Sequence, residues 1–441
     1  MRLLSIAIAL LLLTFVCPVL RTEATAVGPA AQPPNIVLII IDTLRADHLS
    51  FYGGLATNTP TLSALAARSA LFANAFAASS WTPPATASLH TGLLPFQHGV
   101  LSGFHVFREQ QKGPTASIMI NAIPQEVQTL AELLKEQGYR TFAVTDNINI
   151  CKAEGFHQGF DRFVNNDYKT AERVNQYVRE WADDILSGGK FFLYLHYNDP
   201  HHPLNGHFPW YKKSDNSRKN LVSQYDSEIE YVDRKIAEVF RLLRLGDDTL
   251  IIFASDHGEE FWDHGGLGHG YNLYNEVLHV PFVFSFPPPD KISGIINHRI
   301  TTMDLLPTIR DYLGLPANDG LAGRSLLPLL RREAGITDDR YLIAHLKRKT
   351  DGTGAKTSRS VIHAQWKWQD LKGEQTFVHD IIADPKEAAP LSGPVADEIG
   401  RRLADHYAQT ETGSGKASAV SVEQTIDAET MESLEALGYV E

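Results

Sequence analysis

The 441-residue chain contains only two cysteines, Cys17 and Cys151, and Cys17 lies in an apolar leader. Without the leader no internal disulfide can form, and a zinc site built from cysteine thiolates is excluded as well. The sequence also has no Asn-x-Ser/Thr acceptor site, so nothing indicates N-glycosylation. Any metal would therefore need carboxylate, hydroxyl or imidazole ligands.

Basic residues are also scarce relative to acidic ones. The chain has 40 Lys and Arg against 52 Asp and Glu, a formal net charge of −12. This balance argues against a protein that binds nucleic acid or an anionic membrane through a basic surface. An anionic substrate would have to be held by a local positive centre, such as a metal ion or histidines. The 43% hydrophobic and 21% charged content is typical of a soluble globular protein of one large domain or two.

The first residues have the features of an export signal. Arg2 is followed by an apolar run from Leu3, and Ala24-Thr25-Ala26 offers a small-x-small cleavage site. This pattern predicts a signal peptide over residues 1–26 and an exported protein, periplasmic or secreted. The apolar run is near the lower length limit for crossing a bilayer, so N-terminal membrane attachment is the alternative.

Strand and helix patterns alternate from residue 35 to about Leu330. The run NIVLIII over residues 35–41 is continuously apolar and β-branched, as in a strand covered on both faces. Thr59-Pro60 is a helix start signal. Further helices are predicted over 174–185 and 222–243, and further strands over 191–197, 249–255 and 280–286. The alternation predicts an α/β fold with a largely parallel sheet, helices on both faces, and ligands beyond the strand ends.

The pattern changes near Arg340. Short alternating segments over 360–369 and 375–382 predict a small antiparallel sheet, followed by a Gly/Ser linker at 412–418 and a last short helix ending in LEALGYVE. The predicted organisation is a catalytic domain over 35–335 and a C-terminal subdomain with its tail over 336–441.

Acidic and imidazole side chains follow two of the predicted strands directly. Asp42 comes after the first strand, and Asp256 and His257 come after the strand over 249–255. Alone, Asp42 would be read as a cap or turn residue. Since both strands are expected to be parallel, the three residues should lie together at the carboxyl edge of the sheet. Asp and His ligands suit one divalent ion of the zinc, manganese or calcium type, and the nitrogen ligand favours zinc or manganese.

A threonine and several histidines add to this set. Pro83 and Pro84 follow Thr82, which predicts that a helix begins only at about Ala85 and that Thr82 lies at its N-terminus, where backbone N–H groups favour an anion. Alone, Thr82 would be read as an ordinary helix cap. The histidines of DPHHPL and HGGLGHG are candidates for acid/base or oxyanion roles. They are His201, His202, His264 and His269.

Several blocks, in order, resemble the sulfatase family: IDTLRADHLSFYG, TPPATASLHTGLLPFQHGV, FLYLHYNDPHHPL, SDHGEEFWDHGGLGHGYNLYNE and MDLLPTIRDYLGLP. The resemblance implies an alkaline-phosphatase-like three-layer α/β/α core with a small C-terminal antiparallel sheet. It also implies roles for individual residues. Asp42, Thr82, Asp256 and His257 match metal ligands, Thr82 matches the nucleophile, and His201 and His269 match contacts to the substrate or leaving group.

The chain departs from the family pattern Cys-x-Pro-x-Arg, because Thr82 stands in the Cys place and Thr86 in the Arg place. Ile41-Asp42 replaces the usual Asp-Asp, and residues 144–148 replace a Gly-Lys-x-His stretch that would hold sulfate. A formylglycine hydrate can expel sulfate by collapsing to the aldehyde, but a threonine ester must be opened by water at its central atom. That reaction is easier to envisage at phosphorus with metal assistance.

The sequence therefore predicts a metal-dependent hydrolase of phosphodiester, phosphonate or sulfate esters in a small-molecule, glycan or lipid substrate. Thr82 would attack, and His201 or His269 would protonate the leaving oxygen. One metal is expected, although Asp199, His201 and His202 leave a second open. The alternatives are a transferase that passes a phospho-group to an alcohol, and a non-catalytic protein that binds anions or glycans.

Overall fold

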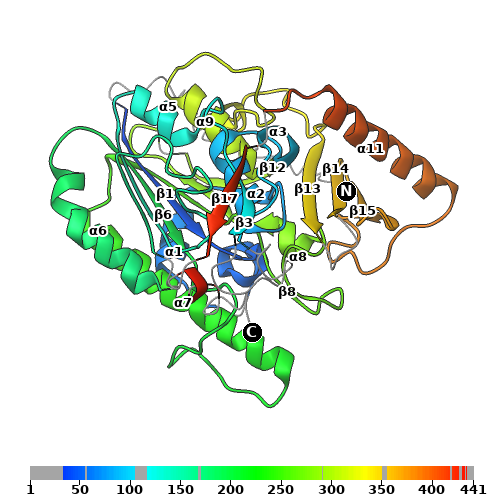
Figure 1. The fold of residues 1–441 in the computed structure, drawn as a ribbon, viewed down its shortest axis with the longest axis horizontal. Coiled ribbons are helices and arrows are strands. Elements are labelled where there is room, and N and C mark those ends of the chain that lie inside the picture. Colours follow the sequence, from blue (N-terminus) through cyan, green and yellow to red (C-terminus); the bar gives the residue numbers. More distant parts are fainter. Residues whose placement is uncertain are drawn as a thin grey trace, which may run out of the picture.

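A computed structural model describes residues 33–54, 57–104, 117–166, 170–290, 292–349, 355–417, 420–426, 430–432 and 434 (Figure 1). The predicted signal peptide and most of the predicted last helix lie outside these residues. Within the described part of the chain, no helix combines the length and apolar character needed to cross a membrane.

A nine-stranded mixed sheet forms the centre of the protein. Its path is β10 (His279–Val280), β2 (Ala70–Phe76), β11 (Phe282–Ser285), β7 (Thr249–Ala254), β1 (Asn35–Ile41), β6 (Phe191–Tyr197), β4 (Arg140–Thr145) and β5 (Arg162–Asn165), with β12 (Gly294–Thr301) beside β2. The strands from β7 to β5 are parallel, as predicted. In contrast, β11 is antiparallel to both β7 and β2. The sheet is therefore mixed and not parallel throughout.

Helices cover both faces of this sheet. Residues 36–41 of β1 are all fully buried. Successive side chains point to opposite faces of the sheet, so the even-numbered residues pack into one hydrophobic core and the odd-numbered residues into another. One core also contains residues of α1 (Pro60–Ala66), α6 (Ala171–Leu186) and α7 (Ser217–Leu242). The other contains residues of α2 (Thr82–Thr91), α5 (Leu130–Glu136), α9 (Leu305–Tyr312) and α10 (Leu327–Leu330). The predicted three-layer α/β/α architecture is confirmed.

The predicted small antiparallel sheet is present. It contains β13 (Leu342–Lys349), β14 (Ala355–His363), β15 (Trp366–Leu371) and β16 (Gln375–Asp380), and α11 (Pro394–Gly413) packs against it through Leu403 and Tyr407. Figure 1 shows this sheet and α11 together at one side of the core. The predicted domain boundary at 335–336 falls in the connection between α10 and β13.

Shorter elements include α3 (Pro95–His98), α8 (Asn275–Leu278) and the hairpin of β8 (Glu260–Phe261) and β9 (Leu267–Gly268). The C-terminal segment contains an element that was not predicted: β17 (Val420–Thr425) pairs with β3 (Ser117–Ala122), about 300 residues earlier in the chain. The predicted linker at 412–418 begins inside the last turn of α11.

Candidate active site

Asp42 lies on the turn that leaves β1, and this turn is strained. Thr43, a β-branched residue, has φ of 58°, in the left-handed region that such residues rarely adopt. Two partners from elsewhere in the chain hold the conformation. The Tyr225 hydroxyl donates to the Thr43 carbonyl at 2.7 Å, and the Leu44 N–H donates to Ser255 Oγ at 3.0 Å. The fold therefore fixes the position of the fully buried Asp42 carboxylate.

Asp256 and His257 follow β7, next to β1 in the sheet, and both are fully buried. The His257 Nδ1–H donates to the Gly258 carbonyl at 2.9 Å, which leaves the lone pair of Nε2 facing the site. Only glycine fits at Gly258, because a Cβ there would lie 2.0 Å from the Glu276 carbonyl oxygen. His257 Nε2 is 3.6 Å from Asp42 Oδ1 and 3.5 Å from Asp256 Oδ2.

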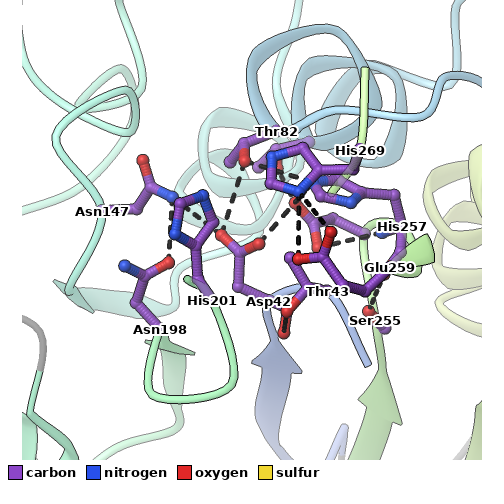
Figure 2. Close-up of polar contacts among 12 residues, drawn as sticks. Asp42, Thr43, Thr82, Asn147, Asn198, His201, Ser255, His257, Glu259 and His269 are labelled. Atoms are coloured by element: carbon purple, nitrogen blue, oxygen red, sulfur yellow. Dashed lines mark hydrogen bonds and ion pairs between the residues drawn. The ribbon is translucent and has the colours of Figure 1, made fainter. Parts of the chain in front are cut away.

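Thr82 is the first residue of α2, so the expectation that this helix begins at about Ala85 is wrong. Prolines are tolerated in a first turn because its N–H groups need no partner within the helix. The structure brings Thr82 to the two strand ends (Figure 2). Its Oγ1 is 3.2 Å from His257 Nε2 and 3.5 Å from Asp42 Oδ2.

Two further side chains that the sequence reasoning did not select hold Asp42. His196 Nε2 lies 3.1 Å from Asp42 Oδ2, while its Nδ1 lies 2.8 Å from the Tyr194 hydroxyl. The Asn147 side-chain amide donates to the same carboxylate oxygen at 2.8 Å. The sequence held a signal for both. His196 is a histidine inside the apolar strand FFLYLHY, and Asn147 is a polar residue just beyond the end of β4, so each could have been predicted to face the site.

The residues present fit a divalent cation. Asp42, His196 and Asp256 each offer a ligand atom, and these atoms lie within 4.8 Å of one another. Asp42 Oδ1 is buried and lacks a hydrogen-bond partner among the described residues, as a coordinating oxygen would. Burial raises the pKa of Asp256 well above its usual range, and the Asp42 carboxylate adds to this rise. Burial also raises the pKa of Asp42, but the hydrogen bond from His196 and the nearby His257 outweigh it and lower that pKa.

The predicted histidines separate into two groups. The ring centroid of His269 is 4.5 Å from that of His257 and 4.9 Å from that of His201, so both His201 and His269 lie at the site. His264 instead stacks on Tyr274 and contacts Glu276 through Nδ1 at 2.6 Å. Burial lowers the pKa of His269 well below its usual value, and His257 lowers it further.

A second metal has less support in this geometry. His202 is exposed, and Asp199 Oδ1 accepts a hydrogen bond from the N–H of Ala171, the first residue of α6, at 3.1 Å. Thr86, in the place of the family arginine, points its hydroxyl to Asp256 Oδ2 at 3.4 Å. The donor set that converges is therefore the one around Asp42, Asp256 and His257.

Comparisons with known proteins identify the family. Residues 34–315 match the sulfatase family model. The chain is 25% identical over 355 residues to human N-acetylgalactosamine-6-sulfatase, with 68% of the chain and 66% of that enzyme covered. It is 22% identical over 451 residues to a Δ4,5-hexuronate-2-O-sulfatase of Bacteroides thetaiotaomicron, with 87% and 89% covered.

A solved structure shows the same fold. The phosphonate monoester hydrolase of Agrobacterium radiobacter superposes with a TM-score of 0.70 at 18% identity, over 86% of this chain and 96% of that one. The family match, the shared fold and the convergence of the motif residues lead to one conclusion. This chain belongs to the sulfatase family of ester hydrolases.

Proposed function

We propose that the protein is a metal-dependent hydrolase of phosphodiester, phosphonate or sulfate esters, with Thr82 as the nucleophile. The observation that supports this proposal most strongly is the position of Thr82 Oγ1, within 3.5 Å of both Asp42 Oδ2 and His257 Nε2. An ordinary helix-capping threonine would direct its oxygen to the backbone of its own helix. Here the hydroxyl faces a buried carboxylate and an imidazole from two different strands.

Asp42, Asp256, His257 and Thr82 would hold one divalent cation, and His196, whose Nε2 lies 3.1 Å from Asp42 Oδ2, is a further candidate ligand. His257 suits the ligand role because its Nδ1–H is already committed to a carbonyl. A bound cation supplies positive charge that acidifies a coordinated hydroxyl and stabilises negative oxygens. Zinc, manganese and calcium all remain within this proposal.

The chain's own residues would carry the reaction in two steps. Ionised Thr82 attacks the central atom of the ester, and the bond from this atom to the leaving oxygen breaks. At the N-terminus of α2, Pro83 and Pro84 carry no N–H group and the Ala85 N–H donates to the Trp81 carbonyl at 3.3 Å. The helix therefore contributes mainly the positive end of its dipole where negative charge develops on the ester oxygens. His201 or His269 protonates the leaving oxygen, and water then opens the Thr82 ester.

The relatives named above act on sulfate esters of sugars or on phosphonate esters, as their names state. Glycans and other small anionic esters are therefore the substrates to test first. Threonine favours phosphorus over sulfur, since its ester cannot collapse to an aldehyde. Export through the leader over residues 1–26 is part of this proposal, and fractionation of cells that express the chain with and without those residues tests it.

Thr82→Ala and Thr82→Ser, assayed against aryl sulfate, phosphodiester and phosphonate substrates, test the nucleophile. We expect Thr82→Ala to lower kcat by a factor of about 10³ or more and Thr82→Ser to retain part of the activity, because serine keeps the attacking oxygen. Mass spectrometry of quenched wild-type protein should find the covalent group on Thr82.

Thr91→Val is a matched control on the same helix, because the Thr91 hydroxyl donates to the Ala87 carbonyl at 2.7 Å and accepts from the Leu93 N–H at 3.4 Å, so its contacts stay within α2 and the turn that follows it. It should leave kcat unchanged. Full activity of Thr82→Ala would show that another group attacks. An alcohol-transfer product in place of free phosphate would identify a transferase.

A further inference from the structure

A fully buried ion pair joins two segments of the C-terminal subdomain. Lys367 on β15 and Glu387, which lies beyond the end of β16, have completely buried side chains, and Lys367 Nζ is 2.9 Å from Glu387 Oε1. Taking two charges out of water costs free energy that their attraction often fails to recover, so a buried ion pair is a poor means of adding stability. Glu387 also has φ of 52°, in the left-handed region that residues other than glycine adopt at a cost. Both features indicate a role other than stability.

The ion pair is bonded to the first residue of α8, which belongs to the core. The Asn275 N–H donates to Glu387 Oε2 at 2.6 Å, and Asn275 Oδ1 accepts from Lys367 Nζ at 2.9 Å. An N–H group in the first turn of a helix has no partner within that helix, so Glu387 supplies the acceptor from a distant part of the chain. The ion pair thus fixes the start of α8, where the small sheet meets the core (Figure 1).

His264, in the loop between β8 and β9, makes a second connection to Glu387. Its Nε2 lies 3.2 Å from the Glu387 carbonyl oxygen, and its Nδ1 lies 2.6 Å from Glu276 Oε1 on α8. The ring also stacks on Tyr274, the residue before α8. The loop, α8 and Glu387 are therefore held together as one unit.

The same helix holds the backbone that follows the candidate metal ligand His257. The Gly258 N–H donates to the Val277 carbonyl at 3.0 Å, and the Glu259 N–H donates to the Glu276 carbonyl at 3.1 Å. There is no slack in this contact, because a Cβ on Gly258 would lie 2.0 Å from the Glu276 carbonyl oxygen. The Gly258 carbonyl in turn accepts from His257 Nδ1 at 2.9 Å. A shift of α8 would therefore move the group that orients the His257 ring.

We infer that Lys367 and Glu387 are positioning residues that act through α8 on the His257 ring, and so on the candidate metal site. This inference rests on the proposed function, because it takes His257 as a ligand of the cation. Groups that orient a metal-binding histidine change the affinity for the metal although they do not touch it. The machinery of the site then extends beyond the predicted catalytic domain over 35–335 into the C-terminal subdomain.

Two double variants that differ in a single acceptor test this inference. Lys367→Met with Glu387→Met replaces the ion pair by apolar side chains and removes the acceptor of the Asn275 N–H. Lys367→Met with Glu387→Gln also removes both charges, but the glutamine oxygen can still accept that hydrogen bond. Neither variant leaves a lone buried charge, so both should fold.

We expect the first double variant to bind Zn²⁺ about 10- to 100-fold more weakly than the wild type, and the second to stay within about 3-fold of it. Competition with a chromophoric chelator measures this affinity. The absorption spectrum of bound Co²⁺ reports the arrangement of the ligands, so it should change in the first variant and not in the second. Wild-type affinity in the first variant, or an equal loss in both, would overturn the inference.

Arg359→Met is the matched control in the same small sheet. Arg359 on β14 pairs with Asp370 on β15 at 2.8 Å, and among the described residues neither side chain has a hydrogen bond or ion pair to α8. This control should keep wild-type Zn²⁺ affinity and the wild-type Co²⁺ spectrum even if its Tm falls. A loss of affinity equal to that of the first double variant would show that loosening of the sheet is the cause, and it would overturn the inference.

Asn275→Ala tests the same link from the side of the core. It removes the contact with Lys367 and the hydrogen bond of the Asn275 amide to the Pro385 carbonyl at 3.1 Å, while both charges stay paired. We expect Zn²⁺ binding to weaken by about 3- to 10-fold. If a double variant does not fold, this variant decides, and unchanged affinity would overturn the inference.

Hydrogen exchange in the metal-free protein separates this inference from the proposed function. It reports the bonds that the Gly258 and Glu259 N–H groups make with α8. A peptide over residues 256–261 should exchange at least about 10-fold faster in Lys367→Met with Glu387→Met than in the wild type, and at the wild-type rate in Arg359→Met. Unchanged exchange in the double variant refutes the positioning role whether or not a cation binds. Faster exchange in a protein that binds no Zn²⁺, Mn²⁺ or Ca²⁺ would refute only the proposed function.

Discussion

Replacement of Glu154 by glutamine should make the protein more stable. Glu154 lies between β4 and β5 with a fully buried side chain, and neither carboxylate oxygen has a hydrogen-bond partner among the described residues. The space around it is tight: a Cβ on Gly103 would lie 2.8 Å from Glu154 Oε1. Burial raises the pKa of this carboxyl well above its ordinary value of 4.5. Glutamine has nearly the same shape and no charge to lose.

The size of the gain follows from proton linkage. Below pH 4.5 the carboxyl is protonated in both the folded and the unfolded state, so its contribution to stability does not depend on pH. Above pH 4.5 the unfolded state releases the proton while the folded state keeps it. The free energy of unfolding then falls by about 1.4 kcal/mol per pH unit until the pH reaches the folded-state pKa. At pH 7, which is 2.5 units above 4.5, the penalty is at most about 3.4 kcal/mol, and Glu154→Gln removes it.

Urea unfolding of wild type and Glu154→Gln at pH 5 and pH 8 measures this effect. The variant should be more stable at both values, with a clearly larger difference at pH 8. Glu398→Gln, which changes an exposed residue of α11, should match the wild type at both. A destabilised Glu154→Gln, or a gain that does not grow with pH, would refute the reasoning, because it would mean that the carboxylate is ionised and held by a bound water or cation.

Two further predictions concern the metal and acid stability. Binding of zinc or manganese should release protons, because burial and Asp42 raise the pKa of Asp256 and a metal ligand must be deprotonated. Calorimetry in buffers of different ionisation enthalpy measures this release. The affinity for the metal should weaken as pH falls, and a chelator should lower the Tm of the metal-bound protein. Burial lowers the pKa of His98 to about 3, so between pH 6.5 and pH 3 the unfolded state binds a proton that the folded state does not, and the free energy of unfolding falls as the pH falls. His98→Gln should flatten that part of a plot of Tm against pH. An unchanged plot would contradict the assignment.

The sequence was sufficient where a local pattern encodes the structure. The uniformly apolar β1 and the Thr59-Pro60 start signal predicted a doubly covered strand and the beginning of α1, and polar residues just after β1 and β7 identified Asp42, Asp256 and His257. Prediction from the sequence failed where a strand pairs with a segment far away in the chain. β17 pairs with β3 far away in the chain, and no periodicity shows that pairing.

The site residues that were missed act through contacts made in three dimensions. His196 becomes significant only because β6 pairs with β1 in a register that places it opposite Ile40, two residues before Asp42. Asn147 becomes significant because β4 lies beside β6, so that the amide can reach the Asp42 carboxylate.

The replacements at Thr86 and Asn147 change how this site must hold an anion. Each stands where the resemblance places a cation or a cationic stretch, and each donates instead to a carboxylate of the candidate metal site, Thr86 to Asp256 and Asn147 to Asp42. A neutral donor in these places does not repel a metal ion, but it adds no charge to attract the substrate. Substrate affinity should then depend mainly on the bound cation, with a smaller contribution from the dipole of α2. Removal of the metal should therefore weaken the binding of a non-hydrolysable anionic analogue as well as turnover, whereas a purely catalytic metal would leave that binding intact.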